Sequence, residues 1–302
     1  MRLPHPILIV CAAVLCGCTV DALMKTITLG GTAVVTATAW RYFVASAIMV
    51  GLFAASRRKM PGWKAIRFHA LRSIAQVLAA VTFFYAITQI ALAEAIVLGF
   101  TAALMIAPIA RVILDEKMGP VTIAASLVGF AGAALAATGE ASGAPVGGNR
   151  AYGIAAILVS AVAYALNIVL LRLRTREEDS LTLVTFMNVF PALFLLPILP
   201  FAGPLPEPDA WPLVGLVSLA AIAIWWLMTI AYARAKAQTL APFEYTGLIW
   251  ASLFGYVFFK EIPGLRLYMG AAIIIVACLV VAFETHFAAR REARAAAAEI
   301  AP

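Results

Sequence analysis

The chain alternates between long apolar stretches and short polar gaps. A bilayer core of about 30 Å needs about 20 apolar residues in a helix, so each long stretch can cross a membrane. The gaps carry turn and charge clusters, and none is long enough to hold a soluble domain. The pattern therefore predicts an all-α polytopic membrane protein with ten transmembrane helices, near residues 6–24, 32–55, 68–89, 93–114, 119–138, 151–172, 181–200, 211–232, 239–259 and 264–285.

Basic residues fall unevenly on the two sides of these helices. With the N-terminus in the cytoplasm, 16 lysines and arginines lie in cytoplasmic gaps and ends. Only 4 lie on the outer side, namely Lys25, Arg150, Lys260 and Arg266. Because positive charge is retained on the cytoplasmic side, we expect a multi-pass protein of the bacterial inner membrane with both termini in the cytoplasm.

Composition excludes the main soluble alternatives. The chain is 64% hydrophobic and 12% charged, whereas soluble domains carry about 25% charged residues. A net charge of +7 would indicate nucleic acid binding in a soluble protein, but here the basic residues sit in gaps between apolar stretches. We therefore expect the lipid bilayer as a partner and no nucleic acid. The first apolar stretch is expected to be a retained helix and no cleaved leader, because more membrane segments follow it.

The two halves of the sequence match each other weakly but in order. Each half has five helices, an odd number, so the second half enters the membrane from the opposite side. Many secondary transporters are inverted repeats of this kind, although a duplication without transport is the alternative. We expect a first repeat over 1–142, a second over 150–286 and a cytoplasmic tail over 287–302, from matches of Ala22-Leu23 with Ala165-Leu166, Tyr85-Ala86 with Tyr232-Ala233, Leu92-Ala93 with Leu240-Ala241 and Glu116 with Glu261.

Several short motifs carry a resemblance to a known family. The chain resembles the ten-helix EamA-type branch of the drug/metabolite transporter superfamily, whose members export amino acids and drugs or import metabolites. Within it the chain looks most like the importers of riboflavin and S-adenosylmethionine. The resemblance implies transport of a small metabolite, and it is carried by Phe83-Phe84-Tyr85-Ala86, Leu92-Ala93-Glu94-Ala95, Leu114-Asp115-Glu116-Lys117, Asp21-Ala22-Leu23, Leu71-Arg72-Ser73, Ala231-Tyr232-Ala233, Ala241-Pro242-Phe243-Glu244-Tyr245-Thr246 and Phe259-Lys260-Glu261.

Charged residues within the helices are the first candidates for a substrate site, because a charge in hydrocarbon needs a partner or water. Arg41 lies mid-helix and either binds an anionic or carbonyl group of the substrate or pairs with a carboxylate such as Asp21. Arg72 lies a turn inside its helix and can also snorkel to the headgroups. Glu94 is either a solvated helix start or a residue with a gating or proton-coupling role, and Glu244 is a comparable candidate.

Aromatic and amide side chains complete the candidate substrate site. Tyr164, Asn167, Trp225, Trp226 and Tyr245 could line a cavity and stack a flat substrate, although interfacial belts are the commoner use of such aromatics. Neighbouring helical residues point about 100° apart, so only one of the two tryptophans is expected to face the centre.

The remaining charged residues are expected to have structural roles. Asp21 and Lys25 are four residues apart, which predicts a local ion pair near the outer surface. Glu116 and Glu261 follow helices in short loops, where they are expected to cap or tether helix ends.

The sequence contains no GxxxxGK[ST], HExxH or GxSxG motif and no helix with a metal-ligand pattern. We therefore expect no enzyme activity, no cofactor and no metal. The predicted function is alternating-access transport of a small planar or zwitterionic metabolite by a secondary transporter. A multidrug or amino-acid exporter of the same fold is one alternative, and an integral-membrane enzyme or scaffold is another. Coupling to protons and the direction of transport stay open.

The predicted topology can be tested with reporter fusions. Fusions at Arg58, Arg176 and Arg291 are expected to report the cytoplasm, and fusions near Arg150 and Pro206 the outer side. A reproducible reversal at any one of these positions would contradict the inverted arrangement of the two halves.

Overall fold

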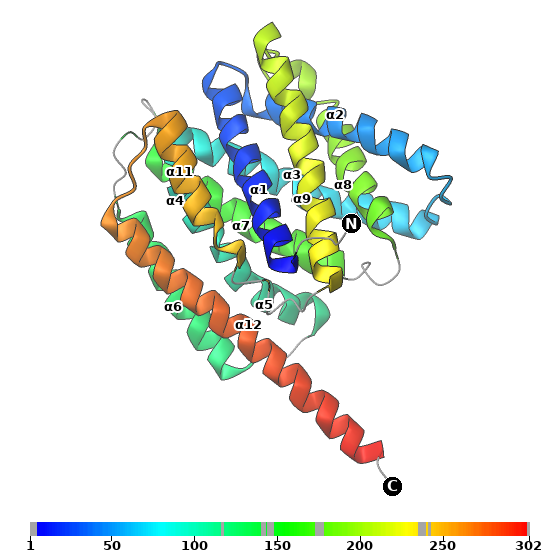
Figure 1. The fold of residues 1–302 in the computed structure, drawn as a ribbon, viewed down its shortest axis with the longest axis vertical. Helices are drawn as coiled ribbons and strands as arrows, with labels where there is room; N and C mark the ends of the chain where they lie inside the picture. Colours follow the sequence, from blue (N-terminus) through cyan, green and yellow to red (C-terminus); the bar gives the residue numbers. More distant parts are fainter. Residues whose placement is uncertain are drawn as a thin grey trace.

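The computed structural model describes residues 5–115, 118–139, 143, 148–172, 178–234, 240 and 243–300, the last 16 of these by backbone alone. The described residues form helices joined by short loops (Figure 1). Its helices are α1 (Pro6–Leu29), α2 (Val34–Ala55), α3 (Trp63–Gln89), α4 (Leu92–Gly99), α5 (Thr101–Leu114), α6 (Pro120–Ala137), α7 (Arg150–Arg172), α8 (Ser180–Leu195), α9 (Trp211–Arg234), α11 (Gly247–Phe259) and α12 (Leu265–Ile300), with short 3-10 turns at Leu199–Phe201 and Pro208–Ala210.

These helices confirm the predicted polytopic membrane fold. Within the described ranges, 8 helices are long and apolar enough to span a bilayer, with α4 and α5 counted together as Leu92–Ile113. The helices α8 and α11 are apolar but shorter, and they complete the ten predicted segments. In the ninth segment, expected at 239–259, residues 240, 243 and 244 are helical and α11 follows from Gly247 to Phe259. The helix α12 continues without a break to Ile300, past the expected end of the tenth segment at 285.

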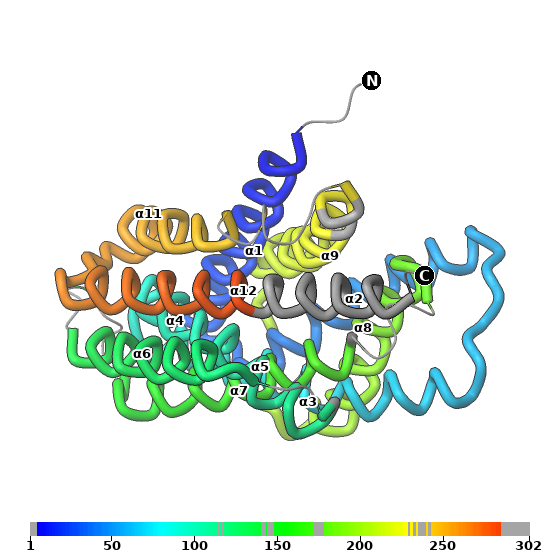
Figure 2. Tube along the Cα trace, turned by 90° about the horizontal axis from the view of Figure 1, so that it is seen from below, coloured from blue at the N-terminus to red at the C-terminus, as the bar shows by residue number. Residues whose placement is uncertain are grey.

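The two halves pack against each other in a symmetric pattern, in which each main contact has an equivalent with the halves reversed. The helix α1 of the first half packs along α9 of the second. In the equivalent contact α7, the counterpart of α1, packs along α3, the counterpart of α9. The remaining main pairs, α2 with α8 and α6 with α12, each join a helix to its own counterpart. Figures 1 and 2 show α6 and α12 running side by side at one edge of the bundle. Each half therefore buries its apolar faces mainly against the other half.

The fourth and ninth membrane segments are interrupted at corresponding positions. The helix α4 ends at Gly99 and α5 starts at Thr101, whose hydroxyl donates to the carbonyl of Leu98 at 2.6 Å. Thr246 comes directly before α11, and its hydroxyl donates to the carbonyl of Phe243, also at 2.6 Å. Interrupted helices at matching places of two repeats are typical of the substrate sites of transporters, so the two breaks point to the centre of the bundle.

Two glycines allow α6 and α12 to approach closely. A Cβ on Gly270 would come within 2.5 Å of the carbonyl oxygen of Gly132 and 2.6 Å of the backbone nitrogen of Ala136. Both neighbours are backbone atoms, which cannot rotate away as a side chain can. Helices in a membrane associate largely through van der Waals packing, and small residues at a crossing let the two backbones come close enough for it.

We therefore expect Gly270→Ala to destabilise the protein by about 1–3 kcal/mol, because the added methyl overpacks the crossing. Gly215→Ala is the matched control, since a Cβ at Gly215 meets nothing within 4 Å. In a helix that change is neutral or stabilises by up to about 1 kcal/mol. Detergent-denaturation curves of the two variants give the comparison, and equal effects would show that the crossing tolerates a methyl group.

Candidate functional site

A large cavity occupies the centre of the bundle, with a volume of about 1340 Å³. The breaks in the fourth and ninth segments meet on its wall, where Gly99, Phe100 and Tyr245 are lining residues. The rings of Phe100 and Tyr245 touch edge to face, with their centroids 5.1 Å apart. The two interrupted helices, one from each half, therefore join at the cavity.

The cavity extends toward one end of the bundle only. It reaches that end at Met118, Glu178 and Ser180, which lie at helix starts on the predicted cytoplasmic side. No lining residue comes from α1 beyond Asp21 or from α7 before Ser160. The opposite ends of these helices are packed against their neighbours, so the cavity is closed on that side.

The lining carries charges of both signs as well as amides and aromatic rings. Carboxylates, a guanidinium and neutral hydrogen-bonding groups come from both halves of the chain. The polar lining residues include Asp21, Arg41, Gln76, Ser160, Asn167, Glu178, Asn188 and Glu244, and the aromatic ones are Tyr42, Phe83, Phe100, Tyr164, Trp225 and Tyr245.

Arg41 is the best-placed cation in this cavity. Its side chain is 8% exposed, and the guanidinium carbon lies 4.0 Å from the centroid of the Tyr42 ring and 5.5 Å from that of Phe84. Among the described residues no ion pair within 4.0 Å involves Arg41, and its Nε is buried without a hydrogen-bond acceptor. Asp21 lines the same cavity but does not pair directly with Arg41. Arg41 therefore packs against aromatic faces, and its Nε–H remains available as a hydrogen-bond donor.

Arg72 lies beneath the lining, where it cannot snorkel. The side chain is fully buried, and its Nη1 donates to Oδ1 of Asn167 at 2.6 Å. The interpretation of Arg72 as a snorkelling residue is therefore wrong: α7 covers this face of α3, so the guanidinium has no route to the headgroups. Arg72 does not line the cavity, but Asn167 does. Arg72 therefore contributes to the cavity by positioning the Asn167 side chain.

Two further interactions join the halves at the same end of the bundle. Nε2 of His69 lies 2.6 Å from Oε2 of Glu178, and the His69 ring stacks on Phe186. Arg58 pairs with Asp179 at 2.7 Å, and both are partly exposed. Neither pair could be predicted from the sequence, because residues so far apart along the chain leave no local pattern. Burial alone raises the pKa of the Asp179 carboxyl, but the hydrogen bonds from Thr182 and Arg58 outweigh it and lower the pKa overall.

The closed end of the cavity is held by a buried ion pair between the halves. Lys25 of α1 pairs with Glu261, which follows α11, and both side chains are at most 1% exposed. Lys25 Nζ also donates to the carbonyl of Ile90 at 3.0 Å, while Glu261 Oε2 accepts from the backbone N–H of Leu92 at 2.7 Å. Glu261 therefore both caps α4 and neutralises Lys25.

These contacts settle the expected roles of two structural residues. The predicted local ion pair between Asp21 and Lys25 is wrong, because Lys25 extends away from the cavity toward Glu261. The predicted capping or tethering role of Glu261 is confirmed. Glu116, its counterpart in the first half, lies outside the described residues.

Glu94 belongs to the closed end as well. It is 2% exposed and pairs at 2.6 Å with Arg150, the first residue of α7, which also donates to the carbonyl of Gly139. The solvated helix start expected for Glu94 is therefore wrong, since α7 covers it. Glu94 is also absent from the cavity lining.

The structure thus gathers most of the predicted site residues and separates three of them. Arg72 and Glu94 are buried beside the cavity, and Trp226 is 48% exposed on the outside of the bundle. Its neighbour Trp225 lines the cavity, so a single tryptophan of the pair faces the centre, as expected. The other predicted residues on the wall are Arg41, Tyr164, Asn167, Glu244 and Tyr245.

Comparison with known proteins identifies a matching family, several related sequences and a similar fold. The sequence profile of the EamA-like transporter family matches residues 5–138 and again 151–283. A riboflavin transporter of Brucella anthropi is 24% identical over 246 residues, which are 80% of this chain and 84% of that protein. An uncharacterized transporter of Helicobacter pylori is 27% identical over 233 residues, 74% of this chain and 75% of that protein.

A riboflavin transporter of Rhizobium johnstonii is 30% identical over 193 residues, 62% of this chain and 60% of that protein. One crystal structure aligns with a TM-score of 0.58 at 19% identity and covers 89% of this chain and 98% of its own. At that identity the likeness concerns the fold alone.

The ion pair at the closed end can be tested by double-mutant analysis. Lys25→Met or Glu261→Gln alone leaves one buried charge without its partner, which is expected to cost about 3–5 kcal/mol of unfolding free energy. The double variant removes both charges and should lose clearly less than the two single losses added. Arg58→Gln is the matched control, because its partly exposed pair is expected to contribute under about 1 kcal/mol. Additive losses at Lys25 and Glu261 would show that the two residues do not stabilise each other.

Proposed function

This chain belongs to the EamA-like transporter family, and we propose that it is a secondary transporter that moves a small planar or zwitterionic metabolite across the bacterial inner membrane by alternating access. The observation that carries the proposal is the central cavity, which is walled by both halves and closed at one end. A solute bound there lies between two halves that can tilt against each other.

The lining supports the proposed substrate class. Asp21 and Glu244 offer acceptors, Arg41 offers donors, and Tyr164 and Trp225 offer flat apolar faces. A polar metabolite with a planar ring can use all three features, whereas a lipophilic drug cation gains nothing from a buried arginine. Relatives that bear the name riboflavin transporter agree with a flat, polar substrate of this kind.

The closed end supports the proposed mechanism. Lys25 and Glu261 hold together α1, the start of α4 and the end of α11. To open the cavity on the opposite side, α1 and the start of α4 must therefore separate from Glu261. Breaking a buried ion pair is unfavourable in hydrocarbon unless water enters. We infer that water entering from the outer side would replace these contacts in the second state.

Uptake by the purified protein in liposomes tests the function class. Riboflavin, S-adenosylmethionine, amino acids and a lipophilic drug cation are offered in turn, with and without a proton gradient. Saturable uptake of a planar or zwitterionic metabolite supports the proposal. Transport of the drug cation or of amino acids alone favours the exporter alternative. Chemical conversion of a solute, or no transport of any compound, favours the enzyme or scaffold alternative.

We expect Arg41→Ala to reduce uptake by about tenfold to a hundredfold, because a hydrogen bond to a charged group contributes about 1.5–3 kcal/mol. Arg41→Lys keeps the charge and should retain part of the activity. The neighbouring tryptophans give a matched pair: Trp225→Ala should raise KM, and Trp226→Ala should not. Normal uptake by Arg41→Ala, or loss of its fold, would show that Arg41 is structural and that the substrate binds elsewhere.

A further inference from the structure

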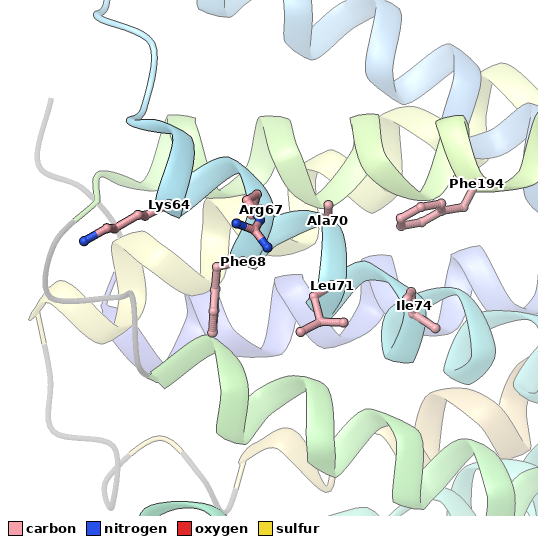
Figure 3. A pocket seen from close by; sticks show the side chains of 7 residues that line it. All are labelled: Lys64, Arg67, Phe68, Ala70, Leu71, Ile74 and Phe194. Atoms are coloured by element: carbon pink, nitrogen blue, oxygen red, sulfur yellow. The ribbon is translucent and has the colours of Figure 1, made fainter.

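A second hollow lies on the outside of the bundle, between α3 and α8, with a volume of about 600 Å³ (Figure 3). Lys64 and Arg67 line one end of it, and Ile74 and Phe194 line the other. Leu71 and Ile74 are 66% and 55% exposed, so this face of α3 is turned toward the bilayer. The hollow is separate from the central cavity, and the two share no lining residue.

The hollow combines an apolar floor with a cationic end. Phe68, Leu71, Ile74 and Phe194 supply the floor, and the two basic side chains are exposed at the helix start, where headgroups lie. No carboxylate lines it. We propose that this groove binds one anionic phospholipid, with its phosphate at Lys64 and Arg67 and one acyl chain along α3.

The length of the groove fits a single membrane leaflet. From Lys64 to Ile74 the helix rises by about 15 Å, at about 1.5 Å per residue. Half of a hydrocarbon core of about 30 Å is the same distance. A lipid whose phosphate contacts Lys64 and Arg67 therefore has acyl chains of the right length to reach Ile74 and Phe194.

The bound lipid lies across a seam between the two halves. Phe194 comes from α8 in the second half, and every other lining residue comes from α3 in the first. The opposite face of α3 carries His69 and Arg72, which bond to Glu178 and Asn167 of the second half. The lipid therefore lies against α3 and α8, which also contribute Gln76 and Asn188 to the wall of the central cavity, and it stabilises the contact between these two helices.

The test uses the full chain, purified in detergent and stripped of lipid. Phosphatidylglycerol and phosphatidylcholine with identical acyl chains are titrated, and bound lipid is counted by native mass spectrometry beside the melting temperature. We expect one phosphatidylglycerol to bind and to raise the melting temperature, with phosphatidylcholine bound at least about tenfold more weakly. Lys64→Gln/Arg67→Gln should weaken phosphatidylglycerol binding by about tenfold or more, because two cations near an anionic headgroup are lost.

The matched control is Lys59→Gln/Arg111→Gln, which removes two exposed basic residues on the same predicted side but outside the groove. It should bind phosphatidylglycerol as the unaltered protein does. Ala70→Phe leaves the cationic end intact and fills the groove, so it should also weaken binding. Equal binding of both lipids, equal losses in the two charge variants, or unchanged binding by Ala70→Phe would each overturn the proposal.

Discussion

The buried pair of Lys25 and Glu261 is the interaction on which the arrangement of the two halves depends. Neither charge can be placed in hydrocarbon alone, and here each neutralises the other while also satisfying a backbone group at the start of α4. The pair therefore fixes three elements at one point, namely α1, the junction before α4 and the turn after α11. Because these elements belong to different halves, the pair also closes the central cavity at that end.

The interrupted helices follow from a related constraint. Backbone groups released within a membrane must be satisfied inside the protein, and hydroxyls of Thr101 and Thr246 accomplish part of this by donating to carbonyls one turn back. The breaks place Phe100 and Tyr245 edge to face on the cavity wall. The same packing that satisfies the backbone therefore provides an aromatic surface, and charged side chains from neighbouring helices surround it.

The sequence by itself determined the membrane fold, the number of spanning segments and much of the cavity. Apolar length and helical spacing are local properties, so they could be recognised without any knowledge of contacts. The same spacing predicted that one tryptophan of two would face the centre, and Trp225 does. The position of Arg41 in the middle of its apolar stretch identified it as a candidate for the site, and Glu244 was a further candidate within a predicted helix.

Only the tertiary structure decided which charges meet. The spacing of Asp21 and Lys25 predicted a local pair, but the partner of Lys25 lies 236 positions away. Glu94 and Arg72 looked like candidates for the membrane surface or the site, and α7 buries both of them. A buried charge is stabilised by whichever opposite group the helix packing brings within reach. That group comes from the other half of the chain, and no local pattern specifies it.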